Sequence, residues 1–118
     1  MNEWTALHTF WSSFGIPAYD ENTVPEDATM PYITYEASVA DYGDKISLMG
    51  SLWYRSMSWQ GISEKTKEID DFIVGGAGIS YGTGRLWITK GSPFAERMTE
   101  PDDNQVRRML IHIQAEIH

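Results

Sequence analysis

The sequence predicts an α+β fold: a two-layer sandwich in which a mainly antiparallel four-stranded sheet carries two helices on one face. Two segments, at residues 4–14 and about 63–74, repeat their apolar residues every three or four positions, as helices do. Four others alternate apolar and polar residues or are rich in β-branched and aromatic side chains, as strands are. The order is helix, strand, strand, helix, strand, strand without an internal repeat, so residues 1–118 are expected to form a single domain.

The first helix is predicted by a stripe of apolar residues with His8 beside it. It ends at Gly15, because the Ile16-Pro17 pair that follows cannot continue it. The stripe consists of Trp4, Leu7, Trp11 and Phe14. Residues 17–31 are polar and acidic and include three prolines, so a long extended loop is expected there. The run PYITYEAS, which begins at Pro31, predicts the first strand.

The second predicted strand, KISLMGSLWYRSM, alternates strictly, and Gly50 within it indicates a bulge or a bend. One face carries Ile46, Leu48, Leu52 and Tyr54, and the opposite face carries Ser47, Met49, Ser51, Trp53 and Arg55. Trp53, together with Leu110 in the last strand, places large apolar groups on the outer face of the sheet. We therefore expect that face to be partly covered, and a neighbouring subunit is a candidate for the cover.

The second helix is predicted to begin near Ser63 and to stop at Gly75-Gly76, which supply a left-handed cap. Its buried stripe is Ile62, Thr66, Ile69, Phe72 and Ile73. The third strand is RLWITK, which GSPF is expected to break. The last strand, VRRMLIHIQAEIH, has the clearest alternation in the chain. Its apolar face consists of Met109, Ile111, Ile113, Ala115 and Ile117.

The net charge of −8 is unevenly distributed. Residues 1–44 contain eight acidic residues and no Lys or Arg, whereas residues 45–118 hold nine of each sign. Such a surface repels the DNA backbone and argues against direct nucleic-acid binding. Both a solvated loop that aids solubility and a negative surface with a function remain open. The absence of Cys excludes disulfides and thiolate chemistry, and neither a signal peptide nor a membrane span is expected.

The stretch Gly78-Ile79-Ser80-Tyr81-Gly82 matches the G-x-S-x-G pattern of a hydrolase nucleophile elbow. That elbow needs a strand before the serine and a helix after it, and here a helix precedes and a strand follows. A phosphate-binding loop fails for the same reason, and no Walker Lys-Ser/Thr pair follows. The three histidines and the adjacent carboxylate pairs lack the spacing of a metal site. We therefore predict no catalytic residue, no cofactor and no metal.

The order and spacing of nearly the whole chain resemble those of the tail-completion (tail terminator) proteins of long-tailed bacteriophages and prophages. The most telling stretches are GIPAY at 15–19, PYITY at 31–35 and WITKGSPF at 87–94. The resemblance implies an α/β sandwich that assembles with itself, commonly as a hexameric ring, at the head-proximal end of the tail tube. Its partners would be the tail tube protein and the head-completion or connector proteins. DNA would pass through without specific binding, and no membrane is involved.

The resemblance also implies a place in the virion tail, with assembly in the cytoplasm of the bacterial host, and no enzyme activity. The residues predicted to contact a neighbouring subunit or partner are Glu26, Asp27, Trp59, Gly78, Tyr81, Gly82 and Phe94. The acidic segment 20–44 is expected to face the channel or a basic partner. Residues 75–84 are expected to be a loop that orders against a neighbour. The alternatives are another neck or minor tail component, an acidic toxin-neutralising protein, and a small hydrolase based on GISYG alone.

Overall fold

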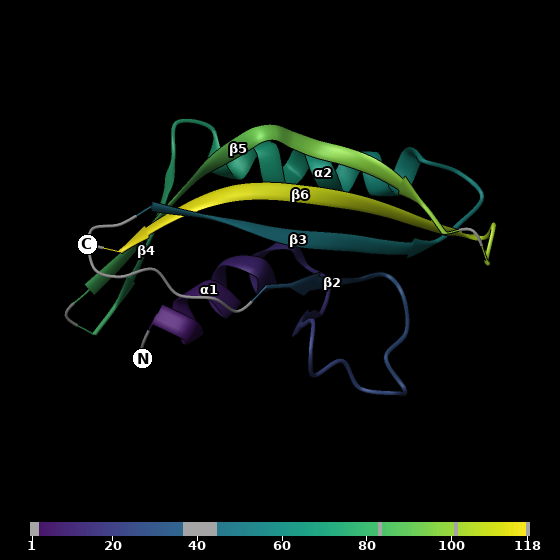
Figure 1. Ribbon diagram of the computed structural model, residues 1–118, viewed down its shortest axis with the longest axis horizontal. Coiled ribbons are helices and arrows are strands. Elements are labelled where there is room, and N and C mark those ends of the chain that lie inside the picture. The colour runs from purple at the N-terminus through teal and green to yellow at the C-terminus, as the bar shows by residue number, and fades with distance from the viewer. Residues whose placement is uncertain (1–2, 37–44, 83, 101, 118) are drawn as a thin grey trace.

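The computed structural model describes residues 3–36, 45–82, 84–100 and 102–117. They form one six-stranded sheet in the order β1-β2-β3-β6-β5-β4, which curls into a half-barrel with two helices (Figure 1). In chain order the elements are α1 (Glu3–Trp11), the 3₁₀ turn η1 (Ser12–Phe14), β1 (Ala18–Asp20), β2 (Tyr32–Tyr35), β3 (Lys45–Arg55), α2 (Gln60–Ile73), β4 (Ala77–Tyr81), β5 (Gly84–Thr99) and β6 (Val106–Ile117).

The prediction of a four-stranded antiparallel sandwich was therefore wrong. The two additional strands are the edges of the sheet: β1 lies in the segment expected to be a loop, and β4 lies in the glycine run expected to be a flexible connector. The sheet is mixed, because β1 pairs with β2 in parallel while all the other pairs are antiparallel. β1 has only three residues, and β4 lies in the glycine run, so neither shows the run of β-branched and aromatic residues that identified the four-residue β2.

The centre of the sheet is formed by the three long strands β3, β6 and β5 (Figure 1). β3 pairs with β6 from Lys45 to Arg55 without a shift in register, so the bulge expected at Gly50 is absent from this pair. The irregularity lies instead in β5, between Lys90 and Ala95. The prediction that GSPF ends the third strand was therefore wrong. These four residues form a bulge within β5.

The core lies between the inner face of the sheet and the two helices. The alternation predicted for the last strand is confirmed, since its five apolar residues are buried there. α1 contributes Phe10 and Trp11, and α2 contributes Ile62, Ile69 and Ile73, to the same cluster. The stripe predicted for α2 is only partly right: Thr66 is half-buried, and Phe72 is 45% exposed, with its ring edge-on to that of Phe14.

The end of α2 is set by glycine, as predicted. Gly75 and Gly76 have φ angles of 78° and 102°, and the Gly76 N–H donates to the Ile73 carbonyl at 2.8 Å. A Cβ at Gly76 would also collide with the ring of Trp87. The two glycines thus let the chain reverse tightly from α2 into β4, so the segment after them is an ordered strand.

Candidate interaction surfaces

The residues predicted to form interfaces lie in separate regions. Gly78, Tyr81 and Gly82 belong to the β4–β5 hairpin at one end of the sheet, whereas Trp59 precedes α2 at the other end (Figure 1). The structure does not describe the side chain of Tyr81. Phe94 lies in the irregular part of β5, and both Phe94 and Trp59 are half-buried against the core. The Lys90 ammonium is 5.7 Å from the Phe94 ring centroid.

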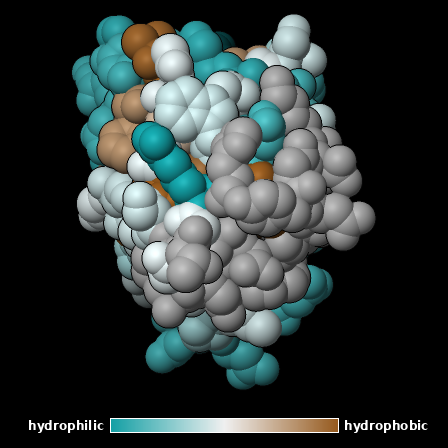
Figure 2. All heavy atoms as spheres, turned by 90° about the vertical axis from the view of Figure 1, so that its left-hand side faces the viewer, coloured by the Kyte–Doolittle hydropathy of each residue, from teal (hydrophilic) through white to brown (hydrophobic). Residues whose placement is uncertain are grey.

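The β4–β5 hairpin contains the G-x-S-x-G stretch. Ser80 is exposed on β4, directly opposite Arg85 on β5, and Gly82 turns the chain with a φ of 44°. The loop expected over residues 75–84 is therefore largely a strand already paired within the monomer. Since β4 leads into another strand, the strand–turn–helix geometry of a nucleophile elbow is absent at Ser80. At this end of the molecule, apolar side chains show in small areas among hydrophilic ones (Figure 2).

A serine, a histidine and a tyrosine do come together where α1 meets β2. The Ser12 hydroxyl lies 3.2 Å from His8 Nε2, and His8 Nδ1 lies 2.9 Å from the Tyr35 hydroxyl. Burial, and then the charge of Asp20, raise the pKa of Tyr35, so its phenol is neutral at physiological pH. A neutral phenol does not stabilise an imidazolium as the carboxylate of a catalytic triad does. The His8–Tyr35 contact instead joins α1 to β2, and the Ser12–His8 contact lies within the segment formed by α1 and η1.

The acidic residues Glu26 and Asp27 are exposed in the β1–β2 loop. They are the central residues of a turn, which is closed by a hydrogen bond of 3.1 Å from the Ala28 N–H to the Pro25 carbonyl. A second turn, at Asp20, anchors the start of the loop: its carboxylate accepts the Asn22 N–H at 2.9 Å. The two carboxylates are thus presented by ordered backbone. The rest of the acidic segment, at residues 37–44, lies outside the described residues.

Trp59 lies between two arginines. The guanidinium carbon of Arg97 is 4.9 Å from a Trp59 ring centroid, and that of Arg107 is 5.5 Å away, both within cation–π range. Backbone carbonyls hold Arg107 in place: Nη1 donates to Asn104 at 2.8 Å and Nη2 donates to Met57 at 2.9 Å. We call these three side chains, Arg97, Trp59 and Arg107, the Trp59 platform.

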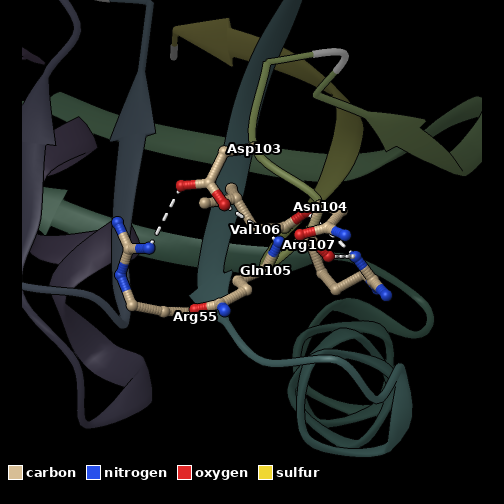
Figure 3. A network of polar contacts seen from close by, with 6 residues as sticks. All are labelled: Arg55, Asp103, Asn104, Gln105, Val106 and Arg107. Carbon is tan, nitrogen blue, oxygen red and sulfur yellow. Dashed lines mark hydrogen bonds and ion pairs between the residues drawn. The ribbon is translucent and has the colours of Figure 1, made fainter.

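A pocket of about 270 Å³ adjoins the platform. It is lined by Met57, Trp59, Glu100, Asp103, Asn104, Val106 and Arg107. The Asp103 carboxylate accepts the Gln105 N–H at 2.9 Å and the Arg55 guanidinium at 3.1 Å (Figure 3), and these two bonds lower its pKa. The contact with Arg55 joins the β5–β6 turn to the end of β3.

The outer face of the sheet carries a row of aromatic side chains that ends in an arginine. The rings of Tyr19 and Tyr32 lie 5.8 Å apart, those of Tyr32 and Trp53 lie 6.5 Å apart, and the Arg108 guanidinium is 4.6 Å from a Trp53 centroid. Trp53 Nε1 also donates to the Thr34 hydroxyl at 2.9 Å. Trp53 and Leu110 are half-buried by their neighbours on this face. Whether another subunit covers the face stays a prediction.

Comparison with known proteins connects this fold to one virion. No family model and no curated protein matches the sequence. Among solved structures, the chain is similar to a chain of the "Virion of native gene transfer agent (GTA) particle", with a TM-score of 0.73 and 17% sequence identity. The match covers 98% of this chain and 93% of the other. The two chains share a fold.

Two further features, a metal-binding cluster and a membrane-spanning helix, are absent from the described residues. Within them, no group of three or more His, Asp or Glu side chains is placed to hold a metal ion. None of the helices described is long and apolar enough to cross a membrane.

Sequence reasoning missed the arginines beside Trp59 and Trp53. Alternation in the last strand placed Arg108 on the outer face, but its pairing with Trp53 follows from the β3–β6 register. Arg97 reaches Trp59 because β5 continues beyond its irregularity. Neither relation is visible in a sequence pattern, since each depends on how strands far apart in the chain are aligned.

Proposed function

We propose that this chain is a structural component of a phage-like virion, which caps the head-proximal end of the tail tube as a ring and forms the head–tail joining surface. The observation that carries the proposal is the shared fold with a chain of the gene transfer agent virion, over nearly the full length of both chains. The order of elements that resembles tail-completion proteins supports the same role.

The surfaces of the molecule suit a role in assembly. The aromatic row on the outer face and the Trp59 platform present large side chains and arginines, which are enriched at protein interfaces. The proposed partners are the tail tube protein, the head-completion or connector proteins, and further copies of the chain in a hexameric ring. With a net charge of −8, the protein lets DNA pass without stable binding.

We infer that the protein is not an enzyme. Ser80, the serine of the only hydrolase-like motif identified in the sequence, lies on a paired strand. The Ser12–His8–Tyr35 contacts lack the carboxylate that a triad requires. The proposed site of action is the virion tail, after assembly in the cytoplasm of the bacterial host.

Deleting the gene from the phage or prophage that encodes the chain tests this function. We expect electron micrographs of the lysates to show separate heads and tails with uncontrolled tail length, and a plasmid copy to restore joined particles. Gold label on a tagged chain should mark the tail end that meets the head. Normal particles after deletion would refute the role.

The same micrographs separate a terminator from another neck component. Loss of a terminator changes the distribution of tail lengths, because nothing stops growth of the tube. Loss of a neck protein that acts after termination leaves tails of normal length that fail to join heads. A normal length distribution with failed joining would therefore reassign the chain to the neck.

A further inference from the structure

Most cations whose side chains are described have a carboxylate partner within the chain. Three arginines are exceptions, since no carboxylate of the described residues lies within ion-pair distance of Arg85, Arg97 or Arg107. Arg85 lies alone on the β4–β5 hairpin, whereas Arg97 and Arg107 come together at Trp59. The ion pairs formed by other Lys and Arg residues are Arg55–Asp103, Lys65–Glu68, Lys67–Asp71, Lys90–Asp70 and Arg108–Glu100.

The carboxylates around the neighbouring pocket are already engaged. Asp103 binds Arg55 and the Gln105 N–H, and the Glu100 carboxylate lies 3.9 Å from Arg108. Arg107 is turned toward backbone carbonyls, while Arg97 is exposed and has its ring contact with Trp59 alone. The platform therefore presents two positive charges that the molecule itself does not pair.

The complementary charges lie on the β1–β2 loop. Glu26 and Asp27 are both exposed at the tip of an ordered turn, and neither has an ion-pair partner among the described residues. No Lys or Arg occurs anywhere in residues 1–44, so the segment around the turn offers no cation of its own. Each copy of the chain thus carries an acidic pair and a basic pair without ion-pair partners of their own, on different elements.

We propose that the Glu26–Asp27 turn of one copy docks on the Trp59 platform of the next copy. The proposal rests on the proposed ring and names its contact. In a ring each copy offers its turn to one neighbour and its platform to the other, so the proposed contact is head-to-tail and not reciprocal. Pro25, exposed beside the acidic pair, can pack on Met57 and Val106 in the adjoining pocket. The Arg97 guanidinium, which lies over the Trp59 ring and has no hydrogen-bond partner in the described residues, keeps its planar donors for a carboxylate, and Arg107 adds positive charge while its donors bind backbone carbonyls.

Charge reversal on each side tests the contact in purified protein. Glu26→Arg/Asp27→Arg and Arg97→Glu should each weaken self-association by about ten-fold or more, as measured by sedimentation velocity and native mass spectrometry. An equimolar mixture of the two variants should associate again, because each supplies the surface that suits the other. The triple variant should do the same on its own. Added salt should weaken the wild-type association.

Lys67→Glu is the matched control. Lys67 is an exposed cation on α2, outside both docking surfaces and outside the predicted contact residues, and it pairs with Asp71 at 3.2 Å. Its reversal should leave association unchanged. Circular dichroism checks that each variant folds, and Arg97→Gln offers a milder change that should weaken association in the same direction.

Three results would overturn the docking contact: a wild-type chain that stays monomeric at every concentration and salt tested, an Arg97→Glu variant that associates normally, or folded variants whose mixture fails to associate. The function fails separately, if deletion of the gene leaves particles normal. A chain that is needed for tail completion but shows no charge-swap rescue would retain the function and lose only this contact.

Discussion

Gly50 provides the sharpest test of how the core is packed. It lies in the middle of β3, opposite Ile111 on β6, and its position faces the indole of Trp11. A Cβ at Gly50 would lie 2.5, 2.8 and 2.9 Å from Cη2, Cζ2 and Cζ3 of that ring. Trp11 is fully buried, stacked on Tyr35 with ring centroids 6.3 Å apart, so it has little room to move.

The expected cost of Gly50→Ala follows from these distances. Overpacking a filled core costs about 1–3 kcal/mol. The smaller conformational entropy of the unfolded alanine chain offsets about 0.4–1 kcal/mol of that. Since the methyl group would collide with a buried ring that has little room to move, we place the overpacking cost at about 2–3 kcal/mol, which leaves a net loss of about 1–2.5 kcal/mol in the free energy of unfolding, or a fall in Tm of about 4–10 °C for a domain of this size.

Thermal and urea denaturation followed by circular dichroism measure the change. Gly61→Ala is the control: Gly61 is exposed in α2, and its Cβ would meet Tyr54 Cε2 at an ordinary 3.5 Å, so alanine should stabilise the helix by about 0.5–1 kcal/mol. Trp11→Phe vacates the space that the new methyl group needs. The two changes should therefore couple favourably by about 0.5–3 kcal/mol in a double-mutant cycle. A Gly50→Ala protein as stable as the wild type, or a cycle without coupling, would refute this account of the packing.

Two further predictions concern the glycine run and pH. Gly76→Ala should lower the free energy of unfolding by about 1–3 kcal/mol in urea titrations, because Gly76 has a positive φ and its Cβ would collide with the Trp87 ring. Ser80→Ala, on the exposed strand, should change neither stability nor virion assembly. A destabilised Ser80→Ala protein beside a normal Gly76→Ala protein would contradict the structure. Burial, and then the charge of Glu21, raise the pKa of Glu36, so its contribution to stability is present below its unfolded-state pKa and is lost as pH rises through the folded-state value. Glu36→Gln should therefore raise the free energy of unfolding at neutral pH but not in acid. An equal gain at both pH values would show that the raised pKa of Glu36 is not the cause.

The long elements could be predicted because each contains its own repeated signal. In β6, five apolar residues at every second position face one core, and in α2 the spacing of Ile62, Ile69 and Ile73 reports a helix in the same way. The edge strands β1 and β4 could not, since β1 has only three residues and the glycines around β4 indicate a connector. Their pairing partners, β2 and β5, are what make them strands.

The candidate contact residues likewise divide into those that the sequence indicates and those that only the structure reveals. Sequence reasoning selected Glu26, Asp27 and Trp59, because acidic turns and aromatic residues next to structural breaks are recognisable in a single chain. It did not predict the arginines beside Trp59, because Arg97 and Arg107 lie on strands that arrive there only through the β5–β6 pairing. It also assigned flexibility to the glycine run, in which the structure shows tight packing of Trp87 over Gly76.

By itself, the sequence determined the two helices, the strands β3 and β6, the inner face of β6 and the excess of negative charge, since periodicity and composition are local properties of a chain. Only the tertiary structure decided the number of strands, the curl of the sheet, the position of the bulge and which charges remain unpaired. The physical reason is that hydrogen bonds between strands and ion pairs join residues distant in the chain. Their alignment is selected by the packing of the whole core, so no short stretch contains it.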